Sequence, residues 1–266
     1  MPLPTRPARP TRSAHPPRPG RAALPRGCAA ATLACALAAG TAPAAAAPQV
    51  LALGPGVAPL TLTGRVHGRD TRVYVVTARA GQTLTVQMAV LANAGLAFNV
   101  VPEGAREALA IGEHSGLRVQ RRLPDDGVYR IEAFLPRSAA RRGETGRFRL
   151  TVAIDGDALA PLPAAQDARV PGTRYHATTE TACRWAYAPA AGHCATGVVR
   201  RGRDGTATVD VRGADGQRRR LLFVHGRLEA TDAAWPVSSR REGNQTLVEI
   251  DGQEQHTVPD ALLTGG

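Results

Sequence analysis

Lysine is absent from this chain, so all 33 of its Lys and Arg positions are arginines. This usage is typical of a GC-rich genome, so a single arginine says little about function and only a cluster of arginines is informative. Aromatic residues make up 4% of the chain, and no basic helix with interleaved aromatic residues is visible. Nucleic-acid-binding surfaces combine those two features. The sequence therefore predicts no nucleic-acid partner, despite its net charge of +11.

The motifs that carry common enzyme chemistry are missing as well. The sequence contains no GxSxG, no HExxH, no phosphate-binding glycine loop and no dinucleotide fingerprint. The nearest candidate is GEHSG at Gly112–Gly116, but neighbouring residues on a strand point to opposite faces, so a polar turn is the simpler interpretation. Asp125-Asp126-Gly127 predicts a hairpin turn with too few oxygen ligands for calcium. We expect a protein that is not an enzyme and needs no cofactor or metal.

Acidic residues are missing from residues 1–47, which contain six arginines. An alanine-rich apolar run, CAAATLACALAAG, and the small residues of TAPAAAAPQ follow these arginines. This order is typical of a secretory signal peptide and its cleavage site. The apolar run is short for a membrane span. We expect residues 1–47 to be a signal peptide that is removed on export, which predicts a periplasmic or secreted protein without a membrane anchor.

The rest of the chain predicts an all-β protein of two domains. Apolar and polar residues alternate in PLTLTGRV, RVYVVTA, QTLTVQMAV, VYRIEAFL and RFRLTVAI, with turn residues between them. Such spacing is typical of an antiparallel β-sandwich, which we place at residues 48–155. Residues 156–172 carry three prolines and predict a linker. Residues 173–266 repeat the strand pattern in GVVRR, TATVDVRG, RRLLFVHGRLEA and TLVEIDG, and predict a small, mainly-β domain.

Positive charge is concentrated in the first of these domains. Residues 48–155 contain 14 arginines and 9 acidic residues, whereas residues 156–266 contain 13 of each. Arg137, Arg141 and Arg142 lie together between two predicted strands that themselves carry arginines. A guanidinium group matches a carboxylate in bidentate geometry and stays charged at any working pH. Such a loop suits a protein that occludes an acidic cleft, although it also suits a solvated basic turn.

The four-residue spacing of Arg137 and Arg141 places both side chains on one side in a strand, and nearly so on a helical turn. Arg142 then points elsewhere. In the alternative interpretation, these arginines pair with Asp70 or Glu144 inside the domain.

Two cysteines, Cys183 and Cys194, remain after the predicted signal peptide. In an exported chain they most simply form a disulfide. The alternative is a metal site that also uses His176 and His193, but its spacing fits no paired-cysteine zinc pattern. Trp185 and Trp235 are either core residues of the second domain or exposed platforms for sugars.

Residues 59–154 resemble a known family. The stretches LTGRVHGRDTRVYVVTARAGQTLTVQM and LPDDGVYRIEAFLPRSAARRGETGRFRLTVAI are similar to the periplasmic inhibitors of g-type (goose-type) lysozyme. The resemblance implies a compact β-sandwich whose loops enter the substrate cleft of the lysozyme. It also implies that Arg137 and Arg141 match the paired arginines that meet the acidic site of the enzyme. Arg69 occupies a position where the family has a tyrosine.

The second domain resembles only a C-terminal β domain of uncharacterised exported bacterial proteins, through GVVRRGRDGTATVDVRGADGQRRRLLFVHG and VPDALLTGG. Two hypotheses follow for the whole chain. The first is an exported inhibitor of g-type lysozyme or of another cell-wall muramidase. The second is an envelope module that binds a peptidoglycan fragment, an acidic polysaccharide or another envelope protein without inhibiting an enzyme.

Overall fold

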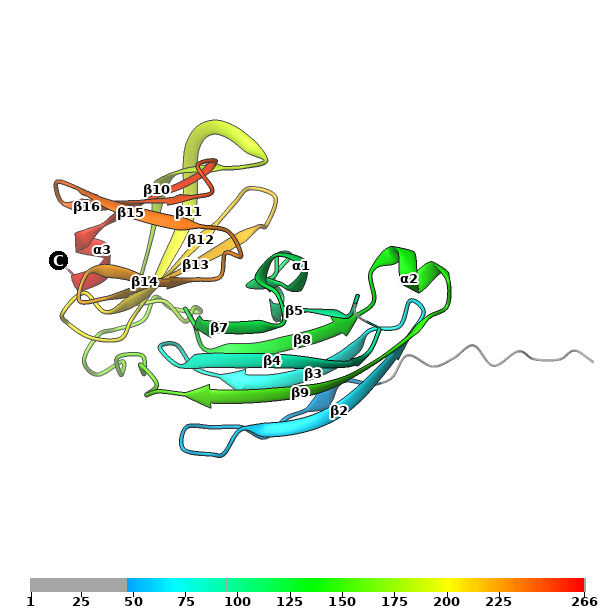
Figure 1. Ribbon diagram of the computed structural model, residues 1–266. Helices are drawn as coiled ribbons and strands as arrows, with labels where there is room; N and C mark the ends of the chain where they lie inside the picture. Colours follow the sequence, from blue (N-terminus) through cyan, green and yellow to red (C-terminus); the bar gives the residue numbers. More distant parts are fainter. Residues whose placement is uncertain (1–46, 94, 266) are drawn as a thin grey trace, which may run out of the picture. The chain divides into compact units, whose positions relative to one another are not determined.

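A computed structural model describes residues 47–93 and 95–265, and these residues form mainly strands (Figure 1). The predicted signal peptide lies outside the described residues except for its last residue. Among the described residues, no helix is long and apolar enough to cross a membrane. The all-β prediction is confirmed.

The first part of the described chain is a sandwich of two sheets. The strand order is β1-β3-β8-β5-β6 in one sheet and β2-β9-β4-β7 in the other. Two single-turn helices lie in the connections. The elements are β1 (Gln49–Val50), β2 (Leu60–His67), β3 (Arg72–Ala78), β4 (Thr83–Ala92), β5 (Ala97–Pro102), β6 (Ala110–Ile111), α1 (Gly112–Ser115), β7 (Arg118–Arg122), β8 (Gly127–Phe134), α2 (Arg137–Arg141) and β9 (Thr145–Asp155). All pairs are antiparallel except β1 with β3, which is parallel.

The core of the sandwich follows directly from the alternation in the sequence. In β8, Tyr129, Ile131 and Ala133 are buried, while the residues between them are partly exposed. Side chains on a strand alternate between its two faces, so one face of each sheet is apolar and packs against the other sheet. Tyr74 and Phe148 meet edge to face between the sheets, with ring centroids 6.3 Å apart. One continuous apolar cluster holds this part of the chain together.

The second part is a single curled sheet with the order β14-β13-β12-β11-β10-β17-β16-β15, and it is nearly barrel-shaped. It has its own apolar cluster, separate from that of the sandwich. Its elements are β10 (Ala177–Trp185), β11 (Ala188–Arg200), β12 (Ala207–Arg212), β13 (Arg218–Val224), β14 (Arg227–Thr231), β15 (Val237–Glu242), β16 (Gln245–Ile250), β17 (Glu254–Pro259) and α3 (Asp260–Thr264).

Several elements differ from the sequence-based prediction. The GEHSG segment, predicted as a turn, forms the short helix α1 between β6 and β7. Strands β1, β5, β6, β7, β10, β15 and β17 were not among the predicted strands. Strand β15 illustrates the reason, since nearly all of VSSRRE is exposed and no apolar face marks it as a strand. It is formed through its pairing with β16.

The predicted linker, residues 156–172, contains neither helix nor strand. It is hydrogen-bonded both to the sandwich and to the curled sheet. Leu159 donates its backbone N–H to Ala80 of the sandwich, at 2.9 Å, and Leu162 donates to Arg200 of the curled sheet, at 2.8 Å. The described residues, 47–93 and 95–265, belong to one compact unit. The division into two domains stays a prediction, which is supported by the two separate apolar clusters.

The structure joins Cys183 and Cys194 in a disulfide between β10 and β11. We expect the double substitution Cys183→Ala with Cys194→Ala to lower the free energy of unfolding by about 2–3 kcal/mol, because the bond closes a short loop in the unfolded chain. Urea denaturation measures this loss. Reduction of the unaltered chain is the matched control and should give a similar loss. Identical denaturation curves with and without reductant, at a confirmed thiol count, would contradict the prediction.

Candidate functional site

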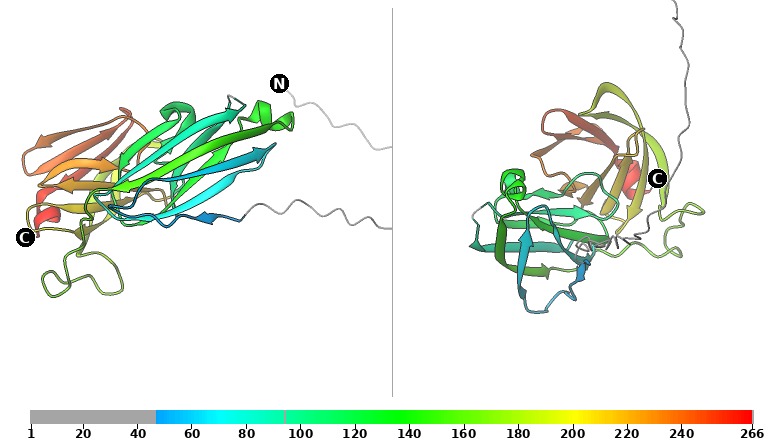
Figure 2. Two further views of the ribbon diagram at one scale, coloured as in Figure 1. Left: turned by 60° about the horizontal axis from the view of Figure 1, so that its bottom comes forward. Right: turned by 90° about the vertical axis from the view of Figure 1, so that its right-hand side faces the viewer.

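The loop between β8 and β9 folds as one helical turn, α2 (Arg137–Arg141), at one end of the sandwich strands (Figure 2). Pro136 precedes the helix, and its carbonyl accepts a hydrogen bond from the N–H of Ala140 at 2.9 Å. Ala139 is buried in the sandwich core, which fixes the inner side of the turn. Arg137 and Arg141 are exposed. The apolar contact of Ala139 thus anchors a turn whose arginines are directed to solvent.

Arg137 and Arg141 lie on the same side of this helical turn, because residues four apart on a helix are neighbours. The Nε of Arg141 donates to the carbonyl oxygen of Arg137 at 3.4 Å. Among the described residues, neither guanidinium group forms an ion pair with a carboxylate. Both arginines therefore remain available for an anionic partner.

Arg142 behaves differently. Its Nε donates to Glu144 at 2.5 Å, and Glu144 also accepts a hydrogen bond from Asn93 at 2.6 Å. The hydrogen bonds from Arg142 and Asn93 lower the pKa of the Glu144 carboxyl group, with that from Arg142 contributing most. Of the three arginines in the cluster, Arg142 alone has a carboxylate partner among the described residues.

Arg69 lies in the turn between β2 and β3, and its side chain is exposed. The turn is bonded to the α2 loop, because the N–H of Gly68 donates to the carbonyl oxygen of Glu144 at 2.8 Å. Gly68 has a φ of +54°, a conformation that a residue with a Cβ rarely adopts. The structure therefore brings the Arg69 turn beside the loop that carries Arg137 and Arg141. We call Arg69, Arg137 and Arg141 the arginine end of the sandwich.

The outer face of the β2–β9 pair adds positive charge from the arginine-bearing strand that follows the loop and from Arg65 on β2. Arg65 on β2 and Arg147 on β9 are register partners, and both are exposed. Two like charges directly opposite each other destabilise a sheet pair. Arg149, two residues further along β9, is also exposed on this strand. Within the described ranges none of the three is in an ion pair. The alternation in GRFRL is the signal that could have revealed them.

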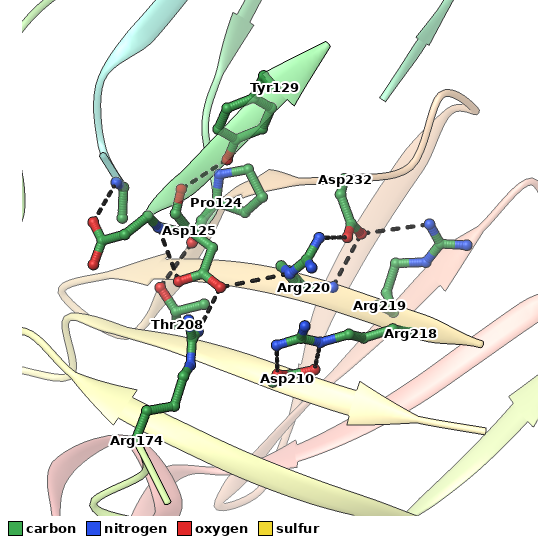
Figure 3. Close-up of polar contacts among 12 residues, drawn as sticks. Pro124, Asp125, Tyr129, Arg174, Thr208, Asp210, Arg218, Arg219, Arg220 and Asp232 are labelled. Carbon is green, nitrogen blue, oxygen red and sulfur yellow. Dashed lines mark hydrogen bonds and ion pairs between the residues drawn. The ribbon is translucent and has the colours of Figure 1, made fainter. Parts of the chain in front are cut away.

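A second polar cluster lies where the other end of β8 meets the curled sheet (Figure 3). We call it the junction cluster, and its centre is Asp125, whose side chain is 3% exposed. Asp125 accepts hydrogen bonds from Arg201 at 3.0 Å and from Arg174, and it forms an ion pair with Arg220 at 3.5 Å. Arg220 also pairs with the buried Asp232 at 3.2 Å. The buried carboxylates of the cluster are each paired with arginines, so removing one of them would leave a buried charge without that partner.

The junction cluster explains the LPDDGVY motif. Leu123 is fully buried in the sandwich core, and the hydroxyl of Tyr129 donates to the backbone carbonyl of Asp125 at 2.7 Å (Figure 3). Thr208 of β12 donates to the carbonyl of Pro124 at 2.7 Å. The predicted hairpin turn is wrong, because β7 and β8 belong to different sheets and the Asp125-Asp126 segment is a bend that connects the two sheets. Asp125 is a buried ion-pair partner rather than an exposed turn residue.

The residues of the alternative metal site have other partners in the structure. Both cysteines are in the disulfide, which removes the alternative metal site. His176 is buried and accepts a hydrogen bond from the N–H of Arg200 through Nδ1, at 2.9 Å. Within the part of the chain that the structure describes, no group of three potential ligands lies close enough for a metal.

The two tryptophans differ in burial. Trp185 is a core residue with 4% exposure, whereas Trp235 is 42% exposed.

The fold and this site define an all-β protein with a β-sandwich whose arginine end is exposed. No family model matches the chain, and no curated protein matches it. Solved structures do, in the N-terminal region. PliG from Aeromonas hydrophila, a periplasmic inhibitor of g-type lysozyme, is 33% identical over 41% of this chain and 96% of PliG, with a TM-score of 0.37.

Two further solved structures resemble the same share of the chain. PliG from Salmonella Typhimurium is 20% identical over 41% of this chain and 97% of that protein, with a TM-score of 0.33. A mutant of the Escherichia coli inhibitor is 22% identical over 41% of this chain and 100% of that protein, with a TM-score of 0.34. These three solved structures are periplasmic inhibitors of g-type lysozyme.

Proposed function

We propose that this chain is an exported, periplasmic inhibitor of g-type lysozyme that inserts its α2 loop into the acidic substrate cleft of the enzyme. The observation that carries the proposal is the pair Arg137 and Arg141. Both are exposed on one helical turn, and neither forms an ion pair among the described residues. The same loop contains Arg142, which is already neutralised by Glu144. The chain thus leaves two guanidinium groups for a partner.

The chemistry of the partner matches this pair. Glycoside hydrolases act through carboxyl groups that flank the scissile bond, and a muramidase cleft depends on a glutamic acid. A guanidinium group donates two parallel hydrogen bonds to a carboxylate, which adds geometric specificity to the charge attraction. Two converging arginines therefore suit both occlusion of the cleft and pairing with its catalytic acid.

The arginine end is also held in place before binding. Ala139 is buried below α2, and the N–H of Gly68 fastens the Arg69 turn to the same loop. A loop that is already ordered loses less conformational freedom on binding, which favours affinity. The exposed Arg65 and Arg147 on the neighbouring strands extend the positive surface. Such a surface increases the rate of association with an acidic cleft, most strongly at low salt.

The arginine end is free of the second part of the chain. Strand β8 begins at the junction cluster and ends just before α2, and its eight residues span about 27 Å at roughly 3.4 Å per residue. No hydrogen bond or ion pair of the described residues joins the α2 loop to residues 156–265. The curled sheet therefore leaves this end open to an enzyme.

A turbidity assay tests the proposal. We expect residues 48–266 to slow the clearing of cell walls by a goose-type lysozyme, because the arginine end blocks the cleft. A chicken-type lysozyme is run in parallel, since the fold alone does not fix the target. Added salt should slow association in the goose-type assay. Full clearing with every goose-type enzyme tested would overturn the proposal and favour an envelope-binding module instead.

A further inference from the structure

A groove with an exposed tryptophan lies where strand β7 of the sandwich meets β14 and the start of β15. Its volume is about 520 Å³, which is within the range of small-ligand sites. One wall is formed by β7 and the other by β14 and the segment that follows it. The side chains that matter here are Gln120, Arg121, Arg122, Glu229, Thr231 and Trp235. Strands β7 and β14 pair with β4 and β13, while Trp235 lies in the irregular segment between β14 and β15.

Trp235 supplies a flat apolar surface in this groove. Its side chain is 42% exposed, while Trp185, the other tryptophan of the chain, is 4% exposed. The ring of His114 packs against Trp235, with centroids 5.3 Å apart. This contact from α1 orients the indole at the edge of the groove. An exposed indole supported in this way is suited to stacking against the apolar face of a sugar ring.

The groove also holds one cation that its own lining does not neutralise. Arg122 pairs with Glu229 across the groove at 3.2 Å, which connects the two walls. Arg121, its neighbour on β7, is partly buried and lines the groove, and it forms no ion pair among the described residues. A partly buried guanidinium group without a partner favours a ligand that carries a carboxylate. The side chains of Gln120 and Thr231 can bond to hydroxyl groups.

We propose that this groove binds a short oligosaccharide that carries a carboxylate. A sugar ring stacks on Trp235, and the carboxylate of the ligand pairs with Arg121. The groove borders β7, whereas the arginine end lies beside α2, so the two sites are separate. This site does not rest on lysozyme inhibition, and it gives the junction between the sandwich and the curled sheet a function of its own.

Titration calorimetry with two matched disaccharides tests the proposal. The acidic probe is N-acetylglucosaminyl-N-acetylmuramic acid, and the neutral probe is N,N′-diacetylchitobiose, which lacks the lactyl carboxylate. We expect the acidic probe to bind roughly tenfold or more tightly than the neutral one, as one charge-assisted hydrogen bond allows. Acrylamide quenching of tryptophan fluorescence should fall on binding, because the probe covers the exposed Trp235.

Three variants locate the site. Arg121→Gln should weaken binding of the acidic probe by roughly tenfold and leave the weak binding of the neutral probe unchanged. Trp235→Ala should weaken binding of both. Arg118→Gln is the matched control, because it removes the same charge from an exposed position of β7 outside the groove.

Equal affinity for the two disaccharides, or equal affinity of the Arg121→Gln and Arg118→Gln proteins for the acidic probe, would overturn the proposal. The proposal would also be overturned if the unaltered protein bound neither the acidic disaccharide nor trigalacturonic acid at millimolar concentration. Lysozyme inhibition should be the same in Trp235→Ala and the unaltered protein, so that the two sites are tested separately.

Discussion

The double substitution Arg137→Ala with Arg141→Ala is expected to abolish inhibition of a goose-type lysozyme while leaving the circular dichroism spectrum unchanged. Each lost charge-assisted contact in a desolvated cleft is worth about 2–5 kcal/mol, so the loss of two contacts removes most of the affinity. The fold is not affected, because both side chains are exposed and neither is in an ion pair within the described chain. Inhibition constants from the turbidity assay measure the effect.

Arg142→Ala is the matched control for this experiment. It removes an arginine from the same loop, but one that already pairs with Glu144. Exposed pairs of this kind contribute little to stability, and we expect the Arg142→Ala protein to inhibit almost as well as the unaltered one. If the double alanine protein kept full inhibition, Arg137 and Arg141 would not be the contact residues. If Arg142→Ala alone abolished inhibition, the assignment within the loop would be wrong.

The substitution Asp125→Ala is expected to destabilise the chain by about 3 kcal/mol, because it removes one partner of a buried ion-pair cluster. Asp125 is buried and forms ion pairs with Arg174 and Arg220 (Figure 3) and with Arg201. Its removal leaves Arg201, whose side chain is 0% exposed, with only the 3.1 Å contact to Asp126 as an ion pair. A buried charge that loses a partner is costly because water cannot replace it. Urea denaturation measures the change.

Asp70→Ala serves as the control for Asp125→Ala. Asp70 is exposed in the turn that contains Arg69, and its carboxylate is in no ion pair of the described residues. Its substitution should change the free energy of unfolding by less than about 0.5 kcal/mol. Limited proteolysis of the Asp125→Ala protein should cut more readily between Asp155 and Gly172, as the predicted two-domain division requires. Equal stability of the two variants would show that the junction cluster does not hold the sandwich and the curled sheet together.

The strands that alternate between apolar and polar residues could be predicted from the sequence, and β3 agrees with its prediction at both ends, Arg72 and Ala78. Their pattern follows from a local rule, because one face of each strand packs into a core. Strand β12 shows where that rule is insufficient. Nearly all of ATVDVR is buried, since Val209 and Val211 face the apolar cluster while Thr208 and Asp210 have polar partners. The sequence indicates the strand but not what covers its second face.

The candidate site was predictable to a similar degree. The spacing of Arg137 and Arg141 implied a shared side in a strand or a helix, and the structure forms the helical turn. The spacing did not reveal that Arg69 lies beside this loop, because that neighbourhood depends on the contact between Gly68 and Glu144. Those two residues are far apart in the sequence, so no local pattern relates them.

The sequence by itself determined the all-β class, the positive charge of residues 48–155 and the arginine cluster, because alternation, composition and short spacing are local properties of the chain. Only the tertiary structure decided which arginines have a carboxylate partner among the described residues and which have none. Arg142 is neutralised by Glu144, and Arg201 is buried against Asp125, while Arg137 and Arg141 are exposed without a carboxylate partner in the described chain. An ion pair depends on the distance between two side chains and on their burial, and both are set by the packing of segments that are distant in sequence.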